Sequence, residues 1–108
     1  MGDGVGAVFA ALADPSRRYV VERLAHVGRA TSTELAGELP MTRQAVAKHL
    51  ATLEQAGLVH ARREGRHVVY RPDPAPLRDA AAWIDRVGAE WDERLEALAR
   101  HVAERGSA

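Results

Sequence analysis

Two segments with helical periodicity are separated by only Pro40 and Met41, and this short junction constrains the fold more than any other feature of the chain. The first segment, 31–39, opens with a threonine followed three residues later by Glu34, which is typical of a capping box. The second, 42–56, repeats apolar residues at spacings of four and three. Helices joined this tightly cannot lie antiparallel, so they cross steeply. We therefore predict a helix-turn-helix.

Two further helices are expected before this pair, over 5–13 and 15–26. Asp14-Pro15 separates them, because aspartate is a good helix cap and proline suits the first helical position. In the second of them, Tyr19 is expected to face inward together with Val20 and Leu24. The chain up to residue 56 is therefore predicted to be helical, with short connections.

A hairpin is predicted directly after the helix pair. Strands over 58–63 and 66–71 alternate polar and apolar residues, and Glu64-Gly65 supplies the turn between them. Helix-turn-helix followed by hairpin predicts a mainly α chain of winged helix-turn-helix class. We expect one domain over 1–108, with the core and wing in 5–71 and a long dimerisation helix over 77–104.

Cysteine is absent from all 108 residues, which excludes disulfides, thiolate metal ligands and thiol redox chemistry. No segment approaches the roughly 20 apolar residues of a membrane span. The first four residues lack the basic start of a signal peptide. We therefore expect a cytoplasmic protein that does not contact a membrane.

Positive charge is confined to the middle of the chain, although the net charge is zero. Residues 41–71 carry six Lys or Arg against two acids, which gives +4. Residues 1–40 sum to −1 (four Arg, five acids) and residues 72–108 to −3 (five Arg, eight acids). Because a nucleic-acid duplex meets the local patch, this distribution favours a DNA-binding middle segment.

The second helix of the pair has a polar outer face suited to base edges. Arg43 can bond guanine bidentately, and Gln44 can do so with adenine. The hairpin tip adds three arginines that suit phosphates. Double-stranded DNA is the expected partner, and the predicted contacts are Thr31, Ser32, Thr42, Arg43, Gln44, Ala47, Lys48, His49, Arg62, Arg63, Arg66 and His67.

The last helix repeats large apolar residues every seven positions, which indicates helix-on-helix packing. A second subunit is the expected partner, and packing onto the chain's own core is the alternative. Trp83 and Trp91 fit either arrangement, or a wall for a small apolar inducer. The predicted dimer contacts are Val5, Val8, Phe9, Leu77, Ile84, Val87, Trp91, Leu95 and Leu98.

Several runs of sequence together resemble the ArsR/SmtB regulators over residues 5–103. These runs are Phe9–Arg18, Thr42–Leu50, Leu53–Val59 and Gly65–Tyr70. The resemblance implies a homodimeric winged-helix repressor that pairs through its first and last helices. It also implies an inverted-repeat operator and release by an inducer.

Many members of that family sense metals, but this chain departs from both family sites. The cysteine site corresponds to 34–39, which has no thiolate. The site on the last helix corresponds to Pro74, Pro76, Val87 and Glu90, of which only Glu90 could ligate. A different site remains open.

The weak candidates for such a site are His101 with Glu104, three apart on one helix, and His60 with His67, if the hairpin brings them face to face. Nickel, zinc or cobalt would suit such nitrogen and oxygen ligands.

Two other function classes compete with DNA binding. The acidic last third would also suit a protein-interaction module, or a regulator that needs a co-regulator protein. An enzyme is not expected, since the sequence pairs no nucleophile with a base and has no phosphate-binding glycine loop or clustered carboxylates.

Overall fold

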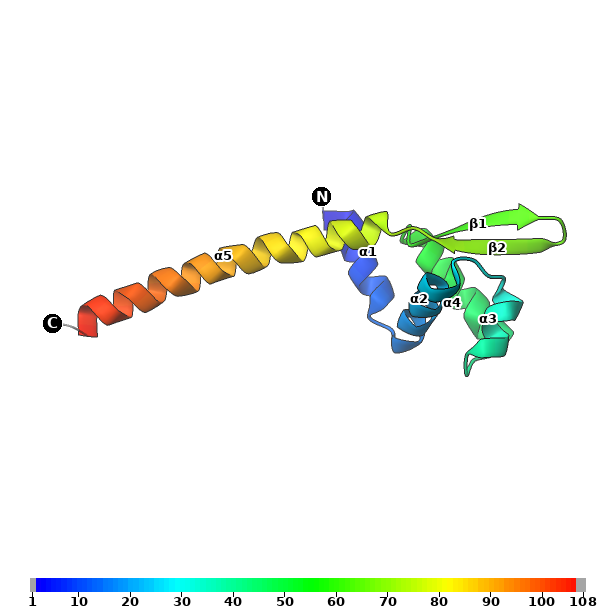
Figure 1. The fold of residues 1–108 in the computed structure, drawn as a ribbon, viewed down its shortest axis with the longest axis horizontal. Coiled ribbons are helices and arrows are strands. Elements are labelled where there is room, and N and C mark those ends of the chain that lie inside the picture. Colours follow the sequence, from blue (N-terminus) through cyan, green and yellow to red (C-terminus); the bar gives the residue numbers. More distant parts are fainter. Residues whose placement is uncertain (1, 107–108) are drawn as a thin grey trace.

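The computed structural model describes residues 2–106 and confirms the predicted fold class and order of elements. Four helices and a hairpin form a body at one end, and one long helix runs out of it (Figure 1). The elements are α1 (Gly2–Leu12), α2 (Pro15–Val27), α3 (Ser32–Glu38), α4 (Arg43–Gln55), β1 (Val59–Glu64), β2 (His67–Pro72) and α5 (Ala75–Gly106).

Side chains cap the helices where the sequence predicted. The Asp14 carboxylate accepts the Ser16 amide at 2.7 Å at the start of α2. Thr31 and Glu34 form a reciprocal capping box on α3, and the Thr42 hydroxyl accepts the amide of residue 45 at 3.1 Å on α4. These caps satisfy amides that a helix start leaves unpaired, so they fix where α2, α3 and α4 begin.

The core lies between α1, α2, α3 and α4, with Ala80 of α5 and the hairpin closing it. Its largest fully buried side chains are Leu24, Leu35, Leu50, Leu53, Val8, Val20, Val46 and Val59. The prediction for Tyr19 is wrong, because this side chain is 57% exposed. Val20 and Leu24 are four apart and share the inner face, whereas position 19 is rotated by roughly 100° from position 20 on a 3.6-residue helix.

The hairpin is antiparallel, and its turn lies one residue later than predicted, which shifts each cross-strand partner by two residues. Glu64 pairs with His67, so the two-residue turn is Gly65-Arg66 rather than Glu64-Gly65. Gly65 has a φ of 62°, a conformation that glycine adopts without a steric penalty. On its other side, β2 bonds residue 30 through two backbone hydrogen bonds with Tyr70, which ties the wing to the loop before α3.

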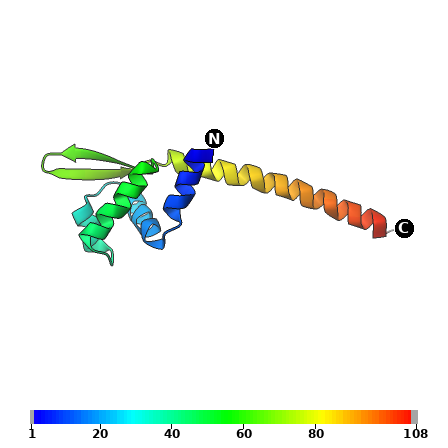
Figure 2. The same cartoon turned by 180° about the vertical axis from the view of Figure 1, so that it is seen from behind.

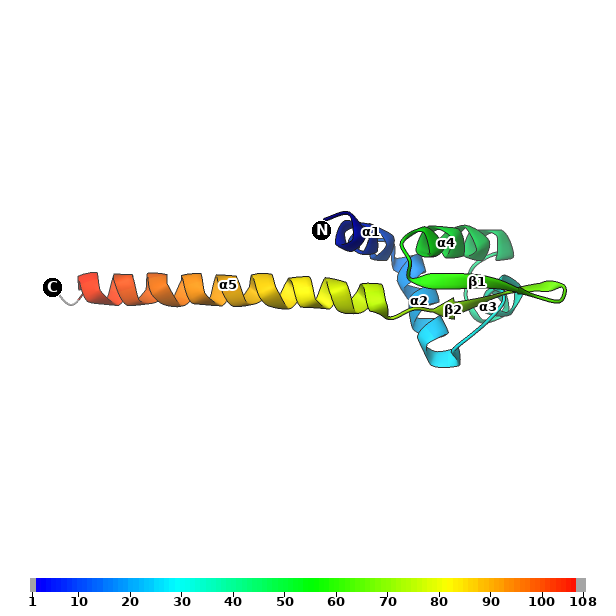
Figure 3. The same cartoon turned by 90° about the horizontal axis from the view of Figure 1, so that it is seen from above.

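The last helix begins two residues earlier than predicted and extends past the predicted end. Asp73 explains the early start, because its carboxylate accepts the amide of Ala75 at 3.0 Å. The described chain measures 75 × 27 × 20 Å, and α5 accounts for the long axis (Figures 2 and 3). Near its start α5 packs on α1, where Phe9 and Trp83 meet edge to face at 5.6 Å.

Candidate nucleic-acid interface

Helix α4 buries one side and exposes the other. Val46, Leu50 and Leu53 are fully buried. The exposed positions on the opposite side include Arg43, Gln44, Ala47 and Lys48. The steep α3–α4 crossing turns this polar side outward, while the small residue at 47 leaves room for a close approach to base edges. The arrangement can present a guanidinium, an amide and an ammonium to one groove.

His49 lies apart from that polar side. It is half-buried, and it lies close enough to the start of α2 to act on Asp14 electrostatically. There the Ser16 amide, Arg17 and His49 together lower the pKa of the Asp14 carboxyl. On a 3.6-residue helix, position 49 lies three residues from Val46 and four from Leu53, at the edge of the buried side, which explains its partial burial.

The start of α3 uses its first hydroxyl internally. Thr31 accepts the Glu34 amide at 3.1 Å, and the Thr31 amide donates to the Glu34 carboxylate at 2.9 Å. Ser32 is half-buried, whereas Thr33 is exposed. Thr33 was not among the DNA contacts predicted from the sequence, although three consecutive hydroxyl residues at a helix start were a signal that could have identified it.

The wing exposes all four residues that the sequence selected. Arg62 and Arg63 are consecutive in β1, so their side chains lie on opposite faces of the hairpin, while Arg66 occupies the turn. His67 shares the Arg62 face, because its register partner is Glu64. The wing can therefore meet negative charge along both faces and at its tip.

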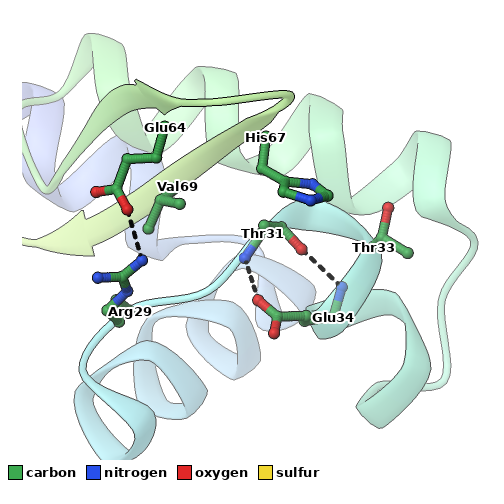
Figure 4. A pocket seen from close by; sticks show the side chains of 7 residues that line it. All are labelled: Arg29, Thr31, Thr33, Glu34, Glu64, His67 and Val69. Carbon is green, nitrogen blue, oxygen red and sulfur yellow. Dashed lines mark hydrogen bonds and ion pairs between the residues drawn. The ribbon is translucent and has the colours of Figure 1, made fainter.

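A cleft of about 500 Å³ separates the wing from the start of α3 (Figure 4). The His67 ring hangs over the start of α3, and Glu64 reaches across to Arg29. Glu64 pairs with Arg29 and with Arg71, each at 2.7 Å. These partners, Arg71 first, lower the pKa of the Glu64 carboxyl. Arg29 has no local sequence signal, because its partner is 35 residues away.

A line of large apolar side chains on α5, the α5 stripe, is largely exposed. It comprises Ile84, Trp91, Leu95, Leu98 and Val102. Phe9 and Leu77, also predicted dimer contacts, are more than a third exposed, and Val87 is half-buried. Val5 and Val8 are buried within the single chain, so they support α1 and offer a partner little surface.

Among residues 2–106, no group of three or more His, Asp or Glu side chains could hold an ion. The facing pair is wrong: His67 lies opposite Glu64, whereas His60 lies opposite Arg71 and bonds Asp73 at 2.7 Å. His101 and Glu104 lie exposed on α5. At the positions that correspond to the family's last-helix site, two prolines and a valine leave Glu90 as the one possible ligand, so these residues do not fit that metal centre.

None of the helices in residues 2–106 has both the length and the apolarity that crossing a membrane requires.

Sequence comparison places this arrangement among gene regulators. Residues 12–62 match a family model described as a helix-turn-helix domain. The chain is 42% identical to the HTH-type transcriptional regulator Rv2034 of Mycobacterium tuberculosis, over 89% of this chain and 86% of that protein. It is 31% identical to the arsenical resistance operon repressor of Escherichia coli, over 89% and 82%.

Solved structures share the fold. An ArsR-like transcriptional regulator from Rhodococcus sp. RHA1 matches with a TM-score of 0.80 and 41% identity, over 88% of this chain and 89% of that one. The homodimeric winged helix-turn-helix DNA-binding domain Mb0332 of Mycobacterium bovis matches with a TM-score of 0.65 and 31% identity, over 82% and 80%.

Proposed function

Because this chain belongs to the ArsR family of winged helix-turn-helix transcriptional regulators, we propose that it is a homodimeric repressor that binds an inverted-repeat operator in double-stranded DNA. The observation that carries this proposal is the exposed polar side of α4, next to a wing with three exposed arginines. The core fixes the orientation of α4 through three fully buried residues, so the polar side has one direction in which to meet a groove.

We assign the contacts by their chemistry. Arg43 and Gln44 read base edges, since each can form a bidentate pair with one base. The backbone contacts carry no sequence choice and fix the register of the protein on the duplex. They are Ser32, Thr42, Lys48, Arg62, Arg63, Arg66 and His67, while Ala47 leaves room for base edges. The half-buried position of His49 and the capping role of Thr31 support structural roles for these two.

The second subunit covers the α5 stripe in this proposal. An exposed line of large apolar residues is costly in water, and a twofold partner presents the same line in return. Phe9, Leu77 and Val87 extend this surface towards α1. Two wings and two α4 helices would then face the two half-sites of one operator, with core and wing in 5–71 and the dimer helix in 77–104 of a single domain.

We propose that the effector is not held at either of the family's metal sites. The lack of thiolates, and the prolines at two positions of the last-helix site, support this. Nickel, zinc or cobalt would have to use weak donors such as His101 and Glu104. Calorimetry with zinc and nickel is expected to give no stoichiometric binding, and tight binding at one ion per chain would overturn this part.

A co-regulator protein is the competing occupant of the exposed end of α5. Its acidic residues outnumber the arginines, and the α5 stripe is open in the single chain. A pull-down from nuclease-treated lysate discriminates between the two. If a protein partner is recovered and the regulator is monomeric, the co-regulator is favoured. If nuclease treatment abolishes the recovery of every partner, DNA binding by a dimer is favoured.

The test of DNA binding is a gel shift against the region upstream of the protein's own gene. Arg43→Ala is expected to relax sequence preference, because it removes a base contact. Arg66→Ala is expected to weaken binding to every duplex and to lower the salt dependence by about one phosphate. Arg100→Ala, near the exposed end of α5, is the matched control. Absence of any shift at low salt would overturn the proposal.

A further inference from the structure

The wing contains one carboxylate among its arginines. Residues 58–72 carry four Arg and a single acid, Glu64. A glutamate at the edge of a DNA-facing surface opposes phosphate, so its position calls for a physical reason. Glu64 ends β1, beside the turn.

Glu64 is held by two arginines from different parts of the chain. Its two carboxylate oxygens each accept one arginine at 2.7 Å, Arg29 from the loop before α3 and Arg71 from the base of β2. Strand alternation places Glu64, Val69 and Arg71 on one face of the hairpin, turned towards the cleft beside α3 (Figure 4). The side chain therefore bridges the wing to the helix-turn-helix.

Both arginines remain within reach of solvent. The Arg29 side chain is 54% exposed and that of Arg71 38%. Without Glu64, each could turn towards a phosphate, since arginine donates bidentately to phosphate as readily as to carboxylate. With Glu64 in place, one carboxylate offsets one of the two positive charges and holds both guanidiniums, which would otherwise add sequence-independent affinity, within the protein.

We infer that Glu64 is a specificity-determining residue that withholds Arg29 and Arg71 from the DNA backbone, and so limits binding to non-operator duplexes. This inference rests on the proposed DNA-binding function. The wing keeps Arg62, Arg63 and Arg66 for phosphate contacts, so positioning on the duplex is retained. Glu64 therefore lowers the part of the DNA affinity that does not depend on sequence.

The test is fluorescence anisotropy with two labelled duplexes, the protein's own upstream region and a scrambled duplex of the same length, titrated over a series of KCl concentrations. Glu64→Gln is expected to bind the scrambled duplex about three- to tenfold more tightly at low salt. Its plot of log K against log salt should steepen by about one to two units per half-site, since each freed arginine neutralises one phosphate at about 0.9 units. The ratio between the two duplexes should fall.

Arg29→Gln supplies a second, independent variant. In the wild-type background it should leave the salt slope unchanged, because Glu64 already holds the Arg29 guanidinium away from phosphate. In the Glu64→Gln background it should remove about half of the added slope. Glu96→Gln on α5 is the charge-matched control, since it removes one exposed carboxylate far along the helix, and its slope should equal that of the wild type.

Three results would overturn the inference. Glu64→Gln could weaken both duplexes with an unchanged slope, which would make Glu64 a structural clasp only. Glu64→Gln could change DNA binding no more than Glu96→Gln does, which would mean that only the net charge of the protein matters. Arg29→Gln alone could lower the slope, which would make Arg29 a phosphate contact already. If the wild type itself does not prefer its own upstream region, the proposed function fails instead, independently of Glu64.

Discussion

Replacing Trp91 with glutamine tests the α5 stripe as the dimer interface. Trp91 is 69% exposed in the single chain. A tryptophan side chain carries on the order of 200 Å², so about 140 Å² remains to be covered. At ~25 cal/mol per Å² this corresponds to about 3.5 kcal/mol per copy, or about 7 kcal/mol for the two copies that a twofold dimer contains.

Association consumes part of this free energy, because ordering two chains is costly and coverage is incomplete. Taking half, the loss is about 3.5 kcal/mol, which corresponds to a rise of a few hundredfold in the dimer dissociation constant. Sedimentation equilibrium over a concentration series measures this constant directly. We expect Trp91→Gln to shift the protein to monomer at concentrations where the wild type is dimeric.

Tyr19→Gln is the matched control for this experiment. Tyr19 is also a largely exposed aromatic residue on a helix, but it lies on α2 and outside the α5 stripe. Its substitution should leave the dissociation constant within about threefold of the wild-type value. If Trp91→Gln remains helical by circular dichroism and dimerises as tightly as Tyr19→Gln, the α5 stripe is not the interface.

Three further predictions concern stability. Arg17→Ala should cost about 1–2 kcal/mol in urea unfolding, because the guanidinium donates to the carbonyls of Ala10 and Ala11 at the end of α1 (3.2 and 2.6 Å), and an unchanged midpoint would contradict this. Thr31→Ala should cost about 1 kcal/mol through loss of the capping box, with Thr31→Ser close to wild type. The pKa values of the Asp14 and Asp73 carboxyls lie below their usual range, chiefly because each carboxylate accepts a backbone amide hydrogen bond. The stability that these hydrogen bonds contribute is fully present above about pH 4 and is lost as the pH falls through the lowered folded-state values. Thermal melts from pH 7 to 3 check this, and Asp73→Asn should flatten the acid side of the profile.

Local signals in the sequence were sufficient for most of the fold. Asp14, Thr31 and Thr42 each act on amides two or three residues ahead, so the cap and its partner lie in one short window. The same holds for the apolar spacing of α4. None of these features depends on residues that are distant in the sequence, which is why the starts of α2, α3 and α4 and the buried side of α4 were predictable.

Register and distant pairing were harder to predict. A shift of one residue in the hairpin changes the partner of every position, and the choice between Glu64-Gly65 and Gly65-Arg66 as the turn depends on how β2 meets residue 30. Neither register makes the two histidines partners: the predicted turn would place His60 opposite Val69, and the observed turn places it opposite Arg71. The ion pair between Arg29 and Glu64 joins residues that are 35 positions apart in the sequence, and no local pattern indicates it.

The candidate interface follows the same division. The exposed residues of α4 were predictable, because they occupy the helix positions that the buried apolar residues do not. The orientation of His49 was not, because it depends on the start of α2, which lies beside α4 only in the folded chain. Single-chain burial of Val5 and Val8 likewise follows from the packing of α1, which the apolar pattern of a short helix does not specify.

Asp73 links the proposed dimer helix to the proposed DNA-reading body. Its amide donates to the carbonyl of Leu58 at 2.8 Å, one carboxylate oxygen bonds His60 at 2.7 Å, and the other accepts the first amide of α5. One residue thus fixes the direction in which α5 leaves the hairpin. Two half-sites on one face of DNA lie about 34–36 Å apart, so a dimer reads both only if this direction is constant. The contact of Phe9 with Trp83 restrains the same helix from the side of α1. Ala80 of α5 is buried in the same core as Leu50 and Leu53 of α4, so a change in the direction of α5 can also reach α4 through the core.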